Sequence, residues 1–280
     1  MSRQVYYRRQ KSTERRRDTA MQVIALVQEV RRDQPRLGTR KLYYLLESEM
    51  GKLHIGRDKL FAILKANHML ITPKRQYHVT TNSYHRFKKH KNLIENMVPS
   101  RPEQLWVADI TYLGNQNHPL YLALVTDAYS KRIMGYDVSD SLATAGSIRA
   151  LKMAIRQRKY PHQSVIHHSD RGFQYCSDTY QKVLKAAGIN CSMTESYDPY
   201  ANAVAERVNG ILKQEYRLTE YGLDVGLMRQ LVRERVDTYN QKRPHLSCEM
   251  LTPNQMHKQD QVRIKTYRNQ NRSGRTATPV

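Results

Sequence analysis

Cysteine is scarce in this sequence: Cys176, Cys191 and Cys248 are the three among 280 residues, and no two form a CxxC pair. An odd number of widely spaced cysteines does not make a disulfide framework, so we expect reduced thiols in a cytosolic protein. The first 175 residues contain no cysteine at all. The five histidines between His54 and His90 therefore cannot belong to a Cys/His zinc finger.

Long apolar runs are also missing. No segment approaches the ~20 apolar residues that a membrane-spanning helix needs. Residues 1–17 are basic and lack the apolar stretch of a signal peptide. We therefore expect a cytoplasmic protein that has no membrane partner.

Acidic side chains are in deficit. The 25 Asp and Glu residues stand against 47 Lys and Arg residues, which gives a formal net charge of +22. A surplus of this size favours a polyanion such as DNA through counterion release, whatever base sequence is bound. A ribosomal or other basic binding protein without chemistry would carry a similar charge, so charge alone leaves that alternative open.

The chain divides into five segments by composition and periodicity. Residues 1–18 are a basic arm, and residues 19–72 carry helical patterns joined by a Gly-bearing connection. Such a pattern is typical of a helix-turn-helix DNA-binding module, although an ordinary three-helix packing unit would look the same. A Lys- and His-rich linker (73–100), a mixed α/β region (101–258) and a basic disordered tail (259–280) follow.

Within the helical segment, the pattern predicts a first helix that begins at Ala20 and a second helix capped by Thr39. The third helix begins near Gly56, and its apolar residues lie on one face. Arg57, Lys59 and Lys65 remain on the solvent side, where we expect them to bind DNA.

From residue 101 onward the period changes. Three strands are followed by alternating helices and strands, with strands expected at 105–113, 120–126, 132–138, 164–168 and 190–193, and helices at 141–159, 178–187 and 202–215. This order predicts a mixed five-stranded α/β sheet covered by helices, as in ribonuclease-H-like folds. The fold class is therefore a ribonuclease-H-like core preceded by an all-α, helix-turn-helix-like domain.

Three carboxylates stand in contexts that suit metal binding. Asp109 lies within an apolar strand, Asp170 directly follows a strand, and Glu206 lies on a helix. Such a trio can bind two divalent ions for phosphoryl transfer on a nucleic-acid backbone. Each also has a simpler interpretation: Asp109 on the polar face of a strand, Asp170 as a turn or N-cap residue, and Glu206 as a solvated helix residue.

Several neighbours of these carboxylates are weighed with them. Asn202 and Lys213 share the helix face of the glutamate, and we expect both to contact DNA. Asp127 ends a predicted strand and is interpreted as a turn cap. His167 and His168 are interpreted as packed or hydrogen-bonded strand residues.

Five motifs, in order, carry a resemblance to a known family. They are Trp106-Val-Ala-Asp-Ile-Thr-Tyr112, Tyr121-Leu-Ala-Leu-Val-Thr-Asp127, His168-Ser-Asp-Arg-Gly-Phe-Gln-Tyr175, Asn202-Ala-Val-Ala-Glu-Arg-Val-Asn-Gly-Ile-Leu-Lys213 and Tyr239-Asn-Gln-Lys-Arg-Pro-His245. Residues 19 to 257 resemble the second-frame transposases of bacterial insertion sequences, which carry the retroviral-integrase catalytic core. The 35 residues between Asp170 and Glu206 match the spacing of that family's acidic triad. The chain departs from retroviral integrases in lacking their zinc domain, and from many relatives in having Arg207-Val208 after the glutamate.

The resemblance implies a DDE-type transposase that cleaves DNA at the ends of an insertion sequence and transfers the freed strand. Asp109, Asp170 and Glu206 would bind two Mg²⁺ ions, with Mn²⁺ as a substitute, and Arg243 of the last motif would contact DNA. The expected partners are element-end and target DNA, further copies of the chain, and an upstream-frame protein or fusion partner, in a nucleoid-associated bacterial setting. A nuclease of the same fold that does not join strands, and a DNA-binding regulator, are the alternatives.

Overall fold

A computed structural model describes residues 2–72, 90–95, 97–114, 119–194 and 203–258 of the chain. Residue contacts divide the chain into two units: residues 1–76 with 214–217, and residues 77–213 with 218–280. Each unit has a hydrophobic core of its own. The linker expected at 73–100 lies mostly outside the described residues, and the tail expected at 259–280 lies wholly outside them.

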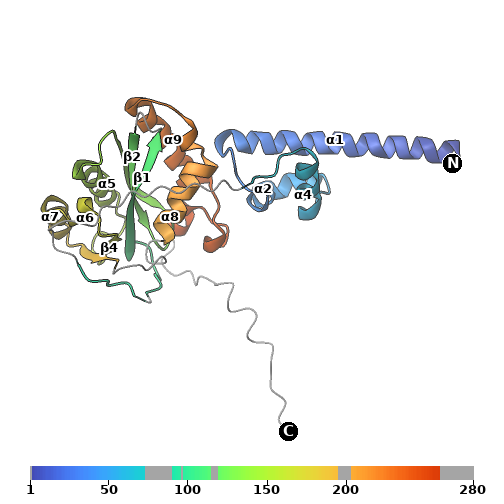
Figure 1. Ribbon diagram of the computed structural model, residues 1–280. Helices are drawn as coiled ribbons and strands as arrows, with labels where there is room; N and C mark the ends of the chain where they lie inside the picture. Colours follow the sequence, from blue (N-terminus) through green and yellow to red (C-terminus); the bar gives the residue numbers. More distant parts are fainter. Residues whose placement is uncertain (1, 73–89, 96, 115–118, 195–202, 259–280) are drawn as a thin grey trace, which may run out of the picture. The chain divides into compact units, whose positions relative to one another are not determined.

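The first unit is helical, with α1 (Arg3–Asp33), α2 (Thr39–Leu45), α3 (Glu47–Lys52) and α4 (Arg57–Ala66) (Figure 1). The C-terminal half of α1 packs with the shorter helices around a core that includes Val23, Val27, Leu42, Met50, Leu60 and Leu64. Helices lie where the pattern predicts them, except that the second predicted helix, expected from Thr39 to Gly51, is divided into α2 and α3.

Two local predictions in this unit are wrong. The first helix begins at Arg3 rather than at Ala20, so the segment expected to be a separate basic arm is the N-terminal half of α1. Ser2 caps this helix through Oγ, which accepts the N–H of Val5 at 3.4 Å, and residues 3–18 contain no Gly or Pro to interrupt it. Thr39 is the first helical residue of α2, and its N-cap is Gly38.

The second unit contains the predicted mixed sheet. Its strands are β1 (Leu105–Gly114), β2 (Pro119–Asp127), β3 (Ile133–Ser139), β4 (Ile166–Ser169) and β5 (Asn190–Met193), in the order β3-β2-β1-β4-β5. The β1–β2 and β2–β3 pairs are antiparallel, and the β1–β4 and β4–β5 pairs are parallel. The ribonuclease-H-like prediction is therefore confirmed.

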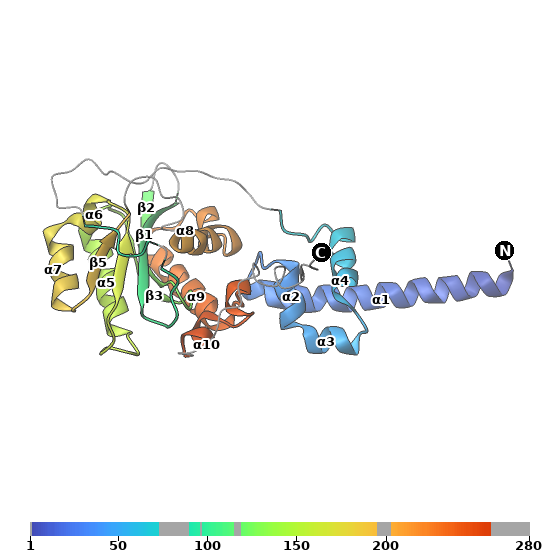
Figure 2. The same ribbon diagram turned by 90° about the horizontal axis from the view of Figure 1, so that it is seen from below.

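Helices cover both faces of the sheet (Figures 1 and 2). On one face lie α5 (Thr144–Arg156), α6 (Phe173–Cys176) and α7 (Asp178–Ala186). On the other lie α8 (Ala203–Gly210), which continues into the π-helical turn η1 (Ile211–Glu215), and α9 (Val225–Lys242). The short helices η2 (Leu218–Glu220), η3 (Leu246–Cys248) and α10 (Pro253–His257) complete the unit, and no helix in the described part is long and apolar enough to cross a bilayer.

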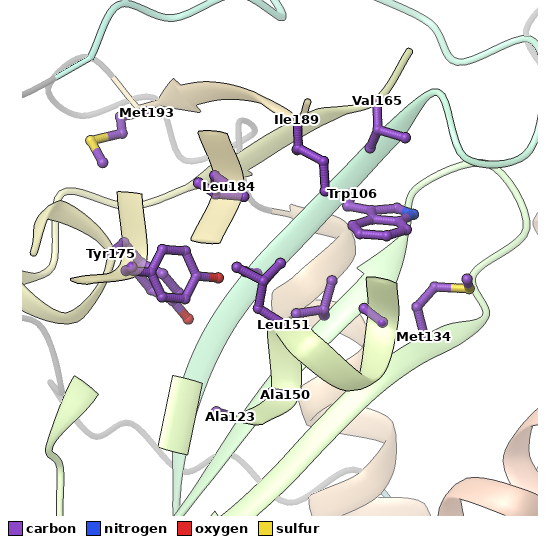
Figure 3. Close-up of a cluster of buried hydrophobic side chains, with 14 of the residues drawn as sticks. Trp106, Ala123, Met134, Ala150, Leu151, Val165, Tyr175, Leu184, Ile189 and Met193 are labelled. Carbon is purple, nitrogen blue, oxygen red and sulfur yellow. The ribbon is translucent and has the colours of Figure 1, made fainter. Parts of the chain in front are cut away.

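The main core lies between the sheet and α5–α7, where Trp106, Leu151, Tyr175 and Leu184 are buried together (Figure 3). Helix α5 approaches β3 so closely at Gly135 that a Cβ atom there would overlap the backbone of Ala150. This packing fixes the sheet on one side and leaves its other face to α8.

Candidate active site

The parallel register of β1 and β4 brings two of the three carboxylates together. Leu105 pairs with Ile166, and Val107 pairs with His168. Continued for two residues, the same register places Asp170, the first residue after β4, opposite Asp109. Because side chains alternate along a strand and Ala108 belongs to the main core, Asp109 lies on the face that α8 covers.

Asp109 is partly buried and is held at both carboxylate oxygens. Its Oδ1 accepts a hydrogen bond from the Ile110 N–H at 2.9 Å, and its Oδ2 accepts a hydrogen bond from Nδ2 of Asn209 at 2.7 Å. Asn209 is a buried residue of α8, three positions after Glu206. Sequence reasoning missed Asn209, although its spacing of three from the glutamate is the signal that could have found it.

Asp170 is held by the turn that follows it. The backbone N–H of Gly172 donates to Oδ1 of Asp170 at 3.0 Å. A Cβ atom at position 172 would stand 2.9 Å from that same oxygen and 3.3 Å from Oε1 of Gln174. The absence of a side chain at Gly172 therefore leaves the space that the carboxylate occupies.

The electrostatics tie the three acids into one site. Burial, with the nearby carboxylates of Asp170 and Glu206, raises the pKa of Asp109 to about 7, against the opposing hydrogen bonds from Ile110 and Asn209. A nearby negative charge disfavours the ionised form of a carboxyl group. The residues around Asp109 thus supply too little positive charge to keep the pKa of its carboxyl group low.

Glu206 is the most open member of the trio. It lies in the first turn of α8 with its side chain exposed. Within the part of the chain that the structure describes, no three Asp, Glu, His or Cys side chains are gathered closely enough to hold a metal ion as they stand.

Lys213 lies beside the same site. Its Nζ donates to Oγ1 of Thr111 at 3.2 Å, and Thr111 is two residues beyond Asp109 on the same side of β1. Burial lowers the pKa of Lys213, and the Asp109 carboxylate opposes that shift. Lys213 thus places a positive charge near the carboxylates. The contact of Lys213 with DNA stays a prediction.

The other predicted DNA contacts have different outcomes. Arg57, Lys59 and Lys65 are exposed on α4 of the first unit, and their role stays a prediction. Asn202 lies outside the described residues.

The assignment of Arg243 to DNA is wrong. Arg243 is 1 % exposed, with Nη1 2.9 Å from Nε2 of His245 and the guanidinium 5.9 Å from the centre of the Tyr239 ring. A guanidinium enclosed in this way cannot reach a DNA phosphate. It holds the segment after α9 against the core.

The simpler interpretations of Asp127 and the histidine pair are confirmed. Asp127 is buried and accepts the N–H groups of Glu103 and Ser130, each at 2.7 Å, as a turn cap does. Nε2 of His167 lies 2.9 Å from the Tyr180 hydroxyl, and Nδ1 of His168 lies 2.9 Å from Oγ of Ser192. Both imidazoles are buried in the fold.

Comparison with known proteins agrees with this geometry. Two family models, each described as an integrase core domain, match residues 99–199 and 187–253. The insertion element IS600 uncharacterized 31 kDa protein of Shigella sonnei is 34 % identical over 221 residues, which is 77 % of this chain and 79 % of that protein. Transposase InsF for insertion sequence IS3fB of Escherichia coli K12 is 34 % identical over 201 residues, covering 71 % of this chain and 69 % of InsF.

Among solved structures, the HTLV-2 integrase catalytic core domain in complex with magnesium is 20 % identical. The match covers 56 % of this chain and 97 % of that one with a TM-score of 0.45. A likeness at this level says nothing about the chemistry of the present chain.

Proposed function

The chain belongs to the insertion-sequence transposases that carry an integrase core domain, and from that premise we propose that it cleaves and joins DNA strands at the ends of an insertion sequence. Polynucleotidyl transfer is the reaction class of such a core.

The observation that carries the proposal is the Asp109 carboxylate, whose pKa is raised to about 7 by burial and by Asp170 and Glu206. A divalent cation would supply the missing positive charge, and hard oxygen ligands of this kind suit Mg²⁺. We assign Asp109, Asp170 and Glu206 as ligands of two Mg²⁺ ions, replaceable by Mn²⁺. When bound, these ions would supply Lewis-acid chemistry for phosphoryl transfer at a phosphodiester.

Other residues of the site orient these ligands. Asn209 holds Oδ2 of Asp109, and the Gly172 N–H holds Oδ1 of Asp170. Lys213, beside Thr111, offers a positive charge toward the DNA phosphate. Water attacks a phosphodiester at the element end, and the freed 3′-hydroxyl then attacks the target. Because water and a DNA hydroxyl are the nucleophiles in these in-line displacements, no covalent protein–DNA intermediate forms.

The partners follow from this reaction. DNA is bound by the basic residues of α4, namely Arg57, Lys59 and Lys65, and by Lys213 at the site. Joining two element ends to one target requires more than one copy of the chain, and an upstream-frame protein or fusion partner completes end recognition. The protein would work on DNA in the bacterial nucleoid.

A strand-transfer assay tests the proposal. Labelled 3′-hydroxyl oligonucleotides from the element ends are incubated with supercoiled plasmid and Mn²⁺. We expect joined products from the wild type and from Asp178→Asn, which removes one exposed carboxylate on α7, and none from Asp170→Asn. DNA binding should stay within a few-fold in all three proteins, because one carboxylate changes little against a net charge of +22.

Three outcomes would contradict the proposal. Cutting without joining would indicate a nuclease. Binding without cutting, even after the upstream-frame protein is added, would indicate a regulator. A trapped 3′-phosphotyrosine would indicate a tyrosine recombinase instead of a metal-assisted enzyme.

A further inference from the structure

The N-terminal half of α1 is a helix without a packed face. Every residue from Arg3 to Asp18 is exposed. This stretch carries seven basic residues and two acidic ones, a formal surplus of +5. Neither the proposed active site nor the helical core of the first unit uses it.

Among the residues that the structure describes, no side chain of this half of α1 is buried. Packing, from which most helical stability in proteins comes, therefore adds little to this half. The first turn contains no acidic residue, and Arg3 lies at the helix N-terminus, where the helix dipole disfavours positive charge. An anionic partner would remove both disadvantages.

The charges on this helix are sorted by face. At about 100° per residue, Val5, Ser12 and Thr19 form one narrow row. Arg8 and Arg15 flank that row on one side, and Arg9 and Arg16 flank it on the other. The two acidic residues, Glu14 and Asp18, lie on the opposite face. There Oε1 of Glu14 accepts a hydrogen bond from Nε2 of Gln10 at 3.2 Å.

We propose that this Ser12 face of α1, residues 5–19, binds in the major groove of duplex DNA. The groove is about 12 Å wide and admits one helix, with a phosphate backbone along each side. The two arginine rows would each meet one backbone, and the small side chains between them would face the base edges. This inference relies on the proposed function only in taking DNA as the partner.

A second copy of the chain is a poorer partner for this face. Two helices that each carry a surplus of +5 would repel each other. The narrow row between the arginines offers only Val5, Ser12 and Thr19, too little apolar surface to offset that repulsion.

Two variants of equal charge on the same helix provide the test. Arg15→Gln with Arg16→Gln removes one arginine from each row of the Ser12 face. Arg3→Gln with Arg17→Gln removes two charges away from it. Binding of the full-length chain to duplex DNA is measured by fluorescence anisotropy from 50 to 300 mM NaCl, roughly the range over which phosphate contacts are lost. EDTA is present, so no strand chemistry occurs.

Each lost phosphate contact reduces the magnitude of the negative slope of log K against log salt by about 0.9. We expect the variant Arg15→Gln with Arg16→Gln (the front pair) to reduce this magnitude by about 1.8, and the variant Arg3→Gln with Arg17→Gln (the back pair) to reduce it by less than half of that. Equal changes in both variants would mean a general charge effect and would overturn the proposal, as would an unchanged slope in the front pair. A front pair that alters sedimentation but not DNA binding would assign the face to another copy of the chain.

The outcome is independent of the active-site proposal. Because no metal is present, failure of strand transfer leaves the salt dependence unaffected, and an unchanged slope leaves the strand-transfer result standing.

Discussion

Two acids, Glu103 just before β1 and Asp109 in the middle of that strand, have surroundings of opposite character. Glu103 is fully buried and receives hydrogen bonds from Nε of Arg158 at 3.1 Å and from the Lys159 N–H at 2.6 Å, with Nε2 of His257 at 3.3 Å. Farther along the strand, Asp109 receives one bond from its own neighbour and one from Asn209.

The pKa shifts follow these partners. Burial by itself would raise the pKa of Glu103, but the hydrogen bonds from His257, Lys159, Arg158 and Tyr160 outweigh burial, and the pKa is lowered. At Asp109 burial prevails, other carboxylates add to it, and the pKa rises to about 7. Burial alone thus does not decide the direction of these two pKa shifts, whereas the supply of positive charge and hydrogen-bond donors does.

The largest effect on stability is expected from a substitution of Glu103. Glu103→Ala leaves the Arg158 guanidinium buried without its partner, and the loss should be about 3–5 kcal/mol in the free energy of unfolding. Because the folded pKa is lowered, this stabilisation is present above the unfolded pKa and is lost as the pH falls through the folded value. Urea denaturation should therefore separate the variant from the wild type at pH 7 and bring the two together in acid. Glu234→Ala, an exposed glutamate on α9, is the control.

The opposite sign is expected at Asp109 in the absence of metal. A carboxyl whose folded pKa is raised destabilises the fold once it ionises, so the cost is absent below pH ~4 and fully present above pH ~7. With EDTA, Asp109→Asn should stabilise the protein at pH 8 by at most about 4 kcal/mol, the equivalent of roughly three pKa units, and leave it unchanged at pH 4. A loss of stability at pH 8 would show that Asp109 is compensated, as Glu103 is.

Asn209 connects α8 to β1 through its hydrogen bond to the Asp109 carboxylate. Hydrogen bonds to charged groups contribute about 1.5–3 kcal/mol, so Asn209→Ala should slow strand transfer by roughly 10- to 100-fold. DNA binding should stay within a few-fold. The control Asn190→Ala, at an exposed position of β5, should change neither strand transfer nor DNA binding. Equal loss of activity and of DNA binding in Asn209→Ala would assign the residue a packing role.

The smallest effect is expected from Gly172→Ala. The added methyl group would contact the Asp170 carboxylate at 2.9 Å and must displace that flexible side chain. We expect strand transfer to fall by several-fold, roughly 1 kcal/mol, with little change in melting temperature. Gly222→Ala is the matched control, since a Cβ atom there has nothing within 4 Å. Full activity in Gly172→Ala would mean that Asp170 tolerates displacement.

Periodicity was sufficient to predict the sheet and the helices that cover it. The strand expected at 190–193 is β5, and the one expected at 105–113 is β1 less one residue. The contact between Asp109 and Asn209 could not be read in this way, because it joins residues 100 positions apart. The pairing of Asp109 with Asp170 likewise depends on the β1–β4 register.

Two errors have physical causes of the same kind. Arg243 resembles a surface cation in the sequence, and its burial depends on Tyr239 and His245 enclosing it. The first half of α1 carries no apolar period because its side chains are exposed, so amphipathic periodicity predicts a helix start at Ala20. Helix propensity and the Ser2 cap were the signals that remained.

Thermal unfolding with and without Mn²⁺ at pH 7.5 tests most directly whether the carboxylates of Asp109, Asp170 and Glu206 form a metal site. A ligand that binds only the folded state raises the melting temperature with its concentration. Mn²⁺ should therefore stabilise the wild type and Glu103→Ala, and should stabilise neither Asp109→Asn nor Asp170→Asn. Equal stabilisation of all four proteins, or none of the wild type, would contradict a metal site at Asp109, Asp170 and Glu206.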